Sequence, residues 1–259
     1  VRLHRTRSIG CPSDVKPKYN NPAVSGCKRD GKRLSYRCSM NIDFSIFFLI
    51  EAAGTIAFAS SGAMVAIRQQ LDLLGVIVLG VTTAVGGGML RDLLLGNVPP
   101  SLFLNPIYVI MAFVTVIVLF CIVRANQRIL ESRSIETYEK VMNIFDAIGL
   151  GAFTVTGIDT AIMAGYKDYH FLSIFLGVLT GVGGGVLRDI MAGQTPFILR
   201  KHVYACASLA GALCYVFLSG LSSNDNDLAM IISACLVILI RMLATRYCWD
   251  LPTATKKKK

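Results

Sequence analysis

The stretch that decides the fold is Gly80-Val-Thr-Thr-Ala-Val-Gly-Gly-Gly-Met-Leu-Arg91-Asp92. It returns 97 residues later as Gly177-Val-Leu-Thr-Gly-Val-Gly-Gly-Gly-Val-Leu-Arg188-Asp189. Upstream, Glu51-Ala-Ala-Gly54-Thr-Ile-Ala57-Phe58 is matched 95 residues later by Asp146-Ala-Ile-Gly149-Leu-Gly-Ala152-Phe153. Downstream, Gly96 and Pro99 recur as Gly193 and Pro196. The chain therefore contains a duplicated unit with a glycine triplet inside an apolar segment.

The composition is typical of a membrane protein. Hydrophobic residues make up 54% of the chain and charged residues only 16%, whereas soluble domains carry roughly a quarter charged residues. A continuous apolar run of about 18 residues or more can cross the bilayer. The chain has seven such runs, at 44–67, 71–90, 105–123, 143–166, 170–192, 202–220 and 227–247. Because these runs do not alternate as barrel strands do, we predict an all-α polytopic membrane protein with seven transmembrane helices.

The duplication also predicts how the helices are oriented. Each copy holds three spans, and an odd number of spans forces the second copy to enter the membrane from the opposite side. We therefore expect an inverted 3+3 repeat, followed by a seventh helix without a counterpart. The predicted parts are a disordered basic tail (1–40), a first repeat (41–133), a second repeat (134–222), the seventh helix (223–250) and a basic tail (251–259). We expect Met40 to be the translation start and residues 1–39 to be an over-extended reading frame.

The net charge of +10 invites a nucleic-acid partner, but the placement of the basic residues favours lipid. They flank the apolar runs, where they set orientation or touch anionic headgroups. On one side lie Arg68, Arg124, Arg128, Arg133, Lys140, Arg200, Lys201, Arg246 and Lys256–Lys259. The positive-inside rule places this side, and with it the C-terminus, in the cytoplasm and the N-terminus outside.

The glycines of the second and fifth spans support two interpretations. Small residues recur every four positions, which permits close helix contact; they are Gly80, Ala84 and Gly88, with Gly177, Gly181 and Gly185 in the second copy. Close contact does not explain a run of three glycines, since each weakens a helix by about 1 kcal/mol relative to Ala. We therefore also predict a bend or a short unwound stretch at Gly86–Gly88 and Gly183–Gly185, whose freed backbone groups Thr83 and Thr180 could satisfy.

Charged residues within the spans are the other candidate pore or gating groups. They are Glu51, Arg91, Asp92, Asp146, Arg188 and Asp189. A carboxylate inside a span is costly unless it is paired or hydrated, so Glu51 and Asp146 either face a cavity or fasten helices together. Adjacent helical residues do not face each other, so crossed pairing of Arg91 with Asp189 and of Arg188 with Asp92 is one arrangement. For both Arg-Asp pairs, anchoring at the membrane interface and a pore-facing or gating role are the two interpretations.

No enzyme signature is present in the sequence. The triplet motif lacks the Lys-Ser/Thr that closes a phosphate-binding loop, and no Cys or His spacing fits a zinc site. We predict a transport protein without metal or cofactor. A K⁺ channel and a carrier for glycine or another small zwitterion both fit inverted repeats, and a non-transporting assembly protein is a third interpretation.

The doubled Gly-Gly-Gly-x-Leu-Arg-Asp motif and the acid-x-x-Gly-x-x-Ala-Phe opening of each copy resemble the bacterial UPF0126 family. This group, also called the glycine-transporter-domain family, is related to trimeric intracellular cation (TRIC) channels, and the resemblance covers about residues 41–250. It implies a homotrimer in the bacterial inner membrane with one K⁺-permeable pore per subunit. It also implies that the second and fifth helices line the pore and hinge at Gly86–Gly88 and Gly183–Gly185. The Lys-Glu-Val motif of animal members is absent, which favours the bacterial branch.

Overall fold

The computed structural model describes residues 45–125, 135–200, 203–221 and 226–247. The predicted tails, and with them the disorder of 1–40 and the start at Met40, lie outside the described residues. The helices are α1 (Ile46–Arg68), α2 (Leu73–Leu94), α3 (Ser101–Leu104), α4 (Ile107–Ala125), α5 (Ile135–Ala161), α6 (His170–Met191), α7 (Phe197–Arg200), α8 (Val203–Leu221) and α9 (Asn226–Arg246). A π-helical turn at Ile162–Tyr166 continues α5.

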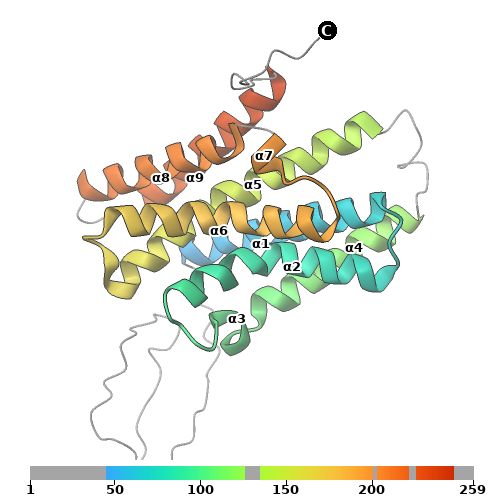
Figure 1. Ribbon diagram of the computed structural model, residues 1–259, viewed down its shortest axis with the longest axis horizontal. Helices are drawn as coiled ribbons and strands as arrows, with labels where there is room; N and C mark the ends of the chain where they lie inside the picture. The colour runs from blue at the N-terminus through green and yellow to red at the C-terminus, as the bar shows by residue number, and fades with distance from the viewer. Residues whose placement is uncertain (1–44, 126–134, 201–202, 222–225, 248–259) are drawn as a thin grey trace, which may run out of the picture. The chain divides into compact units, whose positions relative to one another are not determined.

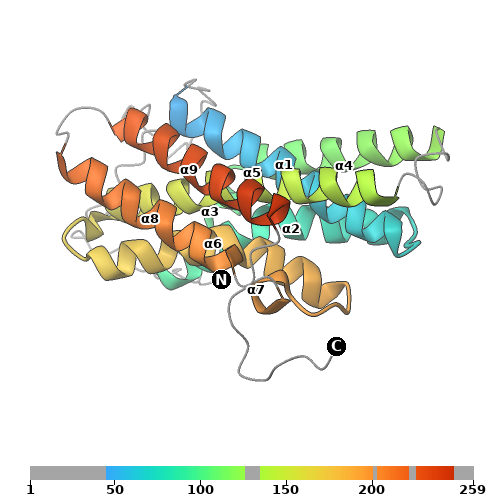
Figure 2. The ribbon, with the colours of Figure 1, turned by 90° about the horizontal axis from the view of Figure 1, so that it is seen from above.

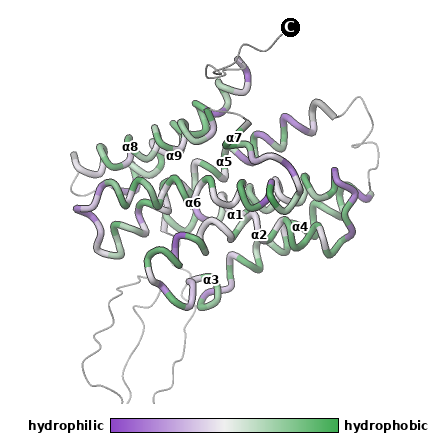
Figure 3. The backbone as a smooth tube through the Cα atoms, in the orientation of Figure 1, coloured by the Kyte–Doolittle hydropathy of each residue, from purple (hydrophilic) through white to green (hydrophobic). Residues whose placement is uncertain are grey.

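The prediction of seven membrane spans is confirmed. Within the described residues, seven helices are long and apolar enough to cross a bilayer, and each coincides with a predicted run. Figure 3 shows hydrophobic residues along these helices, with hydrophilic residues gathered mainly near their ends. The short helices α3 and α7 were not predicted, because four residues carry no readable periodicity.

Local signals set the ends of the helices. Ser45 caps α1 by accepting the Phe48 N–H at 3.3 Å, and Asp72 caps α2 by accepting the Gly75 N–H at 2.7 Å. Such caps satisfy backbone donors that a helix start leaves unpaired. At the other end of α2, Gly96 has a φ of +74°, and its counterpart Gly193 after α6 has +63°. Glycine adopts this left-handed conformation without strain, which explains why the motif repeats a glycine at this position.

Four helices form the centre of the bundle. Helices α1, α2, α5 and α6 pack against one another, α4 packs on α1 and α2, and α8 and α9 pack on the α5 side. Figures 1 and 2 show α4 on one side of this centre and α8 with α9 on the other. The buried share is 72% for the span built on α5 but only 17% for α4. Helix α5 is therefore the core helix, whereas α4 offers its apolar surface to lipid or to another subunit.

The two halves, α1 to α4 and α5 to α8, are inverted relative to each other. Where α1 meets α5, Gly54 lies against Ala152 and Gly149 lies against Phe58. Further along α1, the Tyr138 hydroxyl donates to the Met64 carbonyl at 2.6 Å. As the residue number along α1 rises, the number of the contacted residue on α5 falls. These two equivalent helices are therefore antiparallel. The predicted inverted 3+3 repeat with an unpaired seventh helix is confirmed.

Candidate functional site

The glycine triplets are the point at which α2 and α6 cross. A Cβ atom added to Gly87 would overlap the Thr180 carbonyl oxygen, and one added to Gly184 would overlap the Thr83 carbonyl oxygen. The contact is reciprocal, since each middle glycine lies against the threonine carbonyl of the opposite helix. The triplets therefore bring two backbones into direct contact at the junction of the two halves, which is what glycine allows and no other residue does.

The helices run through the triplets without interruption. Both α2 and α6 keep α-helical backbone from end to end, so the predicted unwound stretch is wrong, while the predicted bend stays a prediction. The prediction used unwinding to explain the consecutive glycines. The close approach of the two backbones explains them instead. Thr83 and Thr180 are fully buried, and their hydroxyls donate to the Leu79 and Leu176 carbonyls, each at 2.6 Å. They bond within their own helices rather than to freed backbone groups.

The small-residue stripe packs each half internally, as predicted. An added Cβ at Gly80 would lie 3.2 Å from the Ala59 carbonyl oxygen on α1. At the equivalent place in the second half, one at Gly177 would lie 2.7 Å from the Thr154 carbonyl oxygen on α5. The same close helix contact is thus built twice, once in each half.

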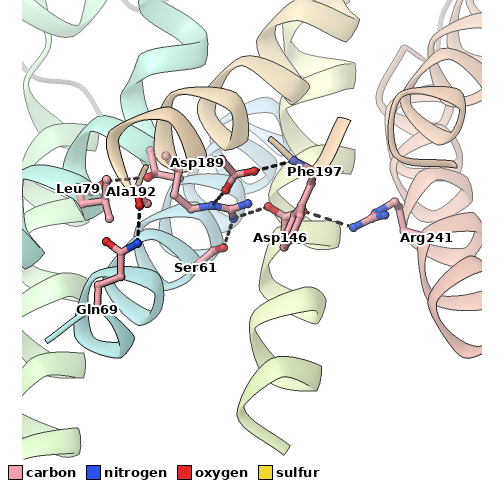
Figure 4. A network of polar contacts seen from close by, with 10 residues as sticks. Ser61, Gln69, Leu79, Asp146, Asp189, Ala192, Phe197 and Arg241 are labelled. Carbon is pink, nitrogen blue, oxygen red and sulfur yellow. Dashed lines mark hydrogen bonds and ion pairs between the residues drawn. The ribbon is translucent and has the colours of Figure 1, made fainter. Parts of the chain in front are cut away.

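Beside the crossing, the second half holds a buried cluster centred on Arg188. Its guanidinium donates to Asp189 from Nε at 2.8 Å, and from Nη1 to Asp146 at 2.7 Å and to Ser61 at 2.5 Å. Arg241 of α9 approaches the other oxygen of Asp146 at 3.5 Å. All five residues are at most 2% exposed. Figure 4 shows Asp146 with Ser61 and Asp189 on one side and Arg241 on the other. We call these five residues the Arg188 cluster.

The charges of the Arg188 cluster balance, since two arginines face two aspartates. Both cations also lie over aromatic rings: Arg188 is 5.0 Å from the Phe197 ring centroid and Arg241 is 4.5 Å from that of Tyr204. Such contacts stabilise a desolvated cation. The buried Tyr204 hydroxyl lies against Gly185, where an added Cβ would come within 2.7 Å of it. The third glycine of the triplet therefore makes room for this tyrosine.

The first half holds the equivalent cluster around Arg91. Arg91 Nε donates to Asp92 at 2.9 Å. Glu51 of α1 and Tyr108 of α4 take the positions that Asp146 of α5 and Tyr204 of α8 have in the second half. The described residues contain no direct ion pair between Glu51 and Arg91 like that between Asp146 and Arg188. We call Glu51, Arg91, Asp92 and Tyr108 the Arg91 cluster.

The crossed pairing of arginines and aspartates between the repeats is wrong. Each arginine pairs with the aspartate next to it in sequence. This is feasible because the long arginine side chain reaches along its own helix to the neighbouring carboxylate. Both arginines are buried within the protein, since Arg91 and Arg188 are only 5% and 0% exposed.

Both aspartates also position a short helix. Asp92 accepts the Ser101 N–H at 2.9 Å and the Ser101 hydroxyl at 2.5 Å, at the start of α3. Asp189 accepts the Phe197 N–H at 2.7 Å, at the start of α7. The repeated Arg-Asp pair thus ties the end of each central helix to the segment leading to the next span.

Sequence reasoning missed several members of the two clusters. Ser61 has a counterpart in Thr156 and Tyr108 in Tyr204, 95 and 96 residues apart, so a longer alignment of the repeats would have found them. Arg241 has no counterpart because α9 is not duplicated. The feature of the sequence that could have identified Arg241 is a single basic residue inside an otherwise apolar span.

Comparison with known proteins agrees with this two-part organisation. A family model described as "Glycine transporter" matches residues 48–124 and 143–220, once in each half. A UPF0126 membrane protein of Vibrio cholerae is 35% identical over 214 residues, covering 82% of this chain and 84% of its own length. The UPF0126 inner membrane protein YadS of Escherichia coli is 33% identical over 208 residues, covering 80% of this chain and 96% of its own.

Solved structures with the same fold are TRIC channels. One, solved to explain conductance through TRIC cation channels, is 35% identical with a TM-score of 0.70, covering 83% of this chain and 100% of its own. The TRIC trimeric intracellular cation channel orthologue of Rhodobacter sphaeroides is 32% identical with a TM-score of 0.70, covering 79% and 99%. Both sequence and fold thus lead to one group of membrane proteins.

Proposed function

Because the chain belongs to the UPF0126 family of membrane proteins, described by its family model as a glycine transporter, we propose that it is a channel for monovalent cations, chiefly K⁺. The subunits assemble as a homotrimer, and each has its own path. The solved relatives support this proposal, since they are TRIC cation channels, one is a trimeric channel, and one is a prokaryotic TRIC channel with a crystal structure in 0.5 M KCl.

One observation carries the proposal: two inverted halves meet at a glycine crossing, and a charged cluster flanks the crossing on each side. Ionisable side chains inside a membrane protein are expensive and usually mark the route of an ion. Arg91 and Arg188 each lie in the last turn of their helix, α2 and α6. Because the two helices cross antiparallel, the Arg91 and Arg188 clusters lie on opposite sides of the crossing. A cation following these two helices passes one cluster, the crossing and then the other.

The crossing and the clusters have different proposed roles. Gly86–Gly88 and Gly183–Gly185 allow α2 and α6 to shift or bend against each other, so they act as hinges. Glu51 and Asp146 are the polar groups a cation meets, and Arg91 and Arg188 hold or release them. Asp92 and Asp189 keep the arginines in place, and Thr83 and Thr180 face the ion only when the crossing opens. The tight contact at Gly87 and Gly184 then corresponds to a closed path.

Reconstitution into planar bilayers tests the proposed function. A K⁺ channel gives unitary currents with discrete openings in symmetric KCl, and the reversal potential in a KCl gradient follows the K⁺ equilibrium potential. A matched preparation of Gly87→Leu, whose side chain cannot fit at the crossing, serves as a non-conducting control. Currents equal to those of protein-free bilayers would contradict the proposal.

A carrier for glycine or another small zwitterion is the second candidate. The family model's description favours it, and each cluster pairs an arginine, which could hold a carboxylate, with an acid, which could hold an ammonium group. Saturable glycine uptake into liposomes without unitary currents would support the carrier over the channel.

Assembly and orientation are part of the proposal. We expect a trimer in a bacterial inner membrane with the C-terminus in the cytoplasm, as the basic residues after the first, third, fifth and seventh spans predict. Light scattering of the detergent complex measures the number of subunits. Fusing the C-terminus to a reporter that is active only in the cytoplasm measures the orientation.

A further inference from the structure

The two clusters use equivalent positions but differ in openness. In the Arg188 cluster Asp146 is fully buried, and Tyr204 is 1% exposed. In the Arg91 cluster the equivalent residues, Glu51 and Tyr108, are only partly buried. The space beside the third glycine differs in the same way. A Cβ added to Gly88 would meet only Arg91 Nη2 within 4 Å, at 3.8 Å, whereas one at Gly185 would come within 2.7 Å of the Tyr204 hydroxyl.

The charges of the two clusters differ as well. Asp146 has two basic neighbours, because Arg241 of α9 lies 3.5 Å from the oxygen that Arg188 does not bind. Helix α9 has no counterpart in the first half, so nothing in the described residues takes the place of Arg241 beside Glu51. Arg91 is already paired with Asp92. With Glu51 ionised, the Arg91 cluster carries one excess negative charge, while the Arg188 cluster is balanced.

The two clusters also differ in the hydrogen bonding of two buried polar atoms. In the Arg188 cluster, Ser61 accepts a hydrogen bond from Arg188. The residues at the equivalent positions of the repeat are Thr156 for Ser61 and Arg91 for Arg188. Within the described residues, Arg91 Nη1 and Thr156 Oγ1 are both buried and have no hydrogen-bond partner. Thr156 is fully buried. The part of the chain that the structure describes also has buried atoms without partners around the Arg188 cluster, namely Arg188 Nη2, Arg241 Nε and the Tyr204 hydroxyl. There, however, the equivalent donor and acceptor, Arg188 Nη1 and Ser61, are bonded to each other. Because buried polar groups without partners are costly, the unbonded pair of Arg91 and Thr156 favours a small polar species at that position.

From these differences we propose that Glu51, Tyr108 and Thr156 form a binding site for a hydrated monovalent cation. The cation lies beside Glu51 in the first half as the Arg241 guanidinium lies beside Asp146 in the second half. The proposal rests on the cation channel proposed above and names a position at which its substrate binds. Oxygen atoms of a carboxylate and a hydroxyl are suitable ligands for a hard cation, and the single excess negative charge matches a single positive one.

Hydration of the cation accounts for the unpartnered atoms. A water molecule bound to the ion can accept from Arg91 Nη1 and donate to Thr156 Oγ1, while the ion itself faces Glu51 and Tyr108. Water commonly satisfies buried polar groups in this way. Arg91 stays paired with Asp92 throughout, so it does not repel the ion as a free cation would.

The first test measures binding without transport. Purified protein is heated in detergent with increasing KCl, and choline chloride keeps the ionic strength constant. A ligand that binds only the folded state raises the melting temperature with concentration. We expect K⁺ to raise it for the natural chain, the rise to vanish in Glu51→Gln and to shrink strongly in Thr156→Val.

The matched control is Ser61→Ala, which removes the equivalent hydroxyl from the balanced cluster. It should lower the melting temperature in choline but keep the full K⁺-dependent rise. A K⁺-dependent rise that persists in both Glu51→Gln and Thr156→Val would overturn the site. So would the absence of any rise in the natural chain.

A gain of binding provides the second test. Arg241→Met leaves Asp146 with one arginine, as Glu51 is in the first half, and retains a side chain of similar length. We expect Tl⁺, a heavy analogue of K⁺, to bind beside Asp146 in crystals of this variant, in addition to a position beside Glu51. Anomalous density at neither acid would overturn the inference.

These outcomes separate the site from the channel. Unitary K⁺ currents with unchanged thermal responses in the Glu51 and Thr156 variants would remove the site and leave the channel. A K⁺-dependent rise that needs Glu51, in a protein without K⁺ currents, would keep the site and remove the channel.

Discussion

The Arg91 and Arg188 clusters show how one duplicated sequence builds two different environments. Both use an acid from the first spanning helix of the half, an arginine near the end of the second and a tyrosine from the third. The Arg188 cluster is the more buried of the two, and Ser61 and Arg241 add contacts to its central ion pair. The Arg91 cluster is more open and lacks a second cation. The difference comes from an element outside the repeat, helix α9, rather than from the repeated motif.

The crossing of α2 and α6 is symmetric in contrast, and the largest expected effect follows from this. In Gly87→Ala or Gly184→Ala the new Cβ overlaps a backbone carbonyl of the opposite helix, and no side-chain rotation can relieve it. Overpacking a core costs about 1–3 kcal/mol, and a fixed backbone contact belongs at or above the top of this range. Thermal unfolding in detergent should show a similarly large loss of stability for both variants.

Gly88→Ala is the control for the crossing, because its added Cβ would find only an arginine nitrogen at 3.8 Å. It should unfold close to the natural chain. A variant of Gly87 that is as stable as that of Gly88 would show that the two helices do not touch here, and the symmetry of the crossing would be lost.

The second effect separates the two clusters directly. Asp146→Asn removes the carboxylate that pairs with Arg188 and Arg241, and breaking a buried ion pair from one side costs about 3–5 kcal/mol. Glu51→Gln should cost far less, because Glu51 is only partly buried and Arg91 keeps Asp92. The unfolding temperatures of the two variants, compared in choline chloride, measure the asymmetry. Equal losses would mean that both clusters are closed.

Much of this fold was predictable from the sequence, and the reasons differ between elements. The seven spans and the inversion follow from apolar runs and from three spans per copy, both of which are local counts. The unwound stretch was wrong because a run of glycines in one helix was considered alone. Its explanation lies in the other helix, where the Thr83 and Thr180 carbonyls occupy the space of the missing Cβ atoms.

The clusters were only half predictable. The repeat pointed to Glu51, Asp146 and both Arg-Asp pairs because these recur, but it carried no information on which residues touch. Arg188 pairs with the adjacent Asp189, and each aspartate of the two pairs holds a short helix. Both contacts depend on how the chain turns after the span. Arg241 could not be connected to Asp146 by any spacing, since the two lie on helices whose packing is decided by tertiary structure.

The third effect compares the two equivalent hydroxyls. Ser61→Ala removes an acceptor from the buried Arg188 guanidinium, and hydrogen bonds to charged groups contribute about 1.5–3 kcal/mol. Thr156→Val removes a hydroxyl that has no partner in the described residues and keeps the side-chain shape. It should be neutral or slightly stabilising without K⁺. Urea or thermal unfolding in choline chloride measures both, and a larger loss for Thr156→Val would show that its hydroxyl is bonded.

The smallest effect isolates burial as the cause of the asymmetry. Arg68 and Glu139 are joined at 2.7 Å, the same distance as Arg188 and Asp146, but their side chains are 47% and 48% exposed instead of 0%. Exposed pairs contribute about 0–1 kcal/mol, because water solvates either partner once the other is removed. Arg68→Gln should therefore shift the unfolding temperature very little, and added salt should reduce even this shift. A loss comparable to that of Asp146→Asn would show that contact distance, rather than removal from water, decides the strength of these pairs. The contrast between the two clusters would then need another cause, because the openness of the Arg91 cluster would no longer explain why Glu51 is expendable for stability.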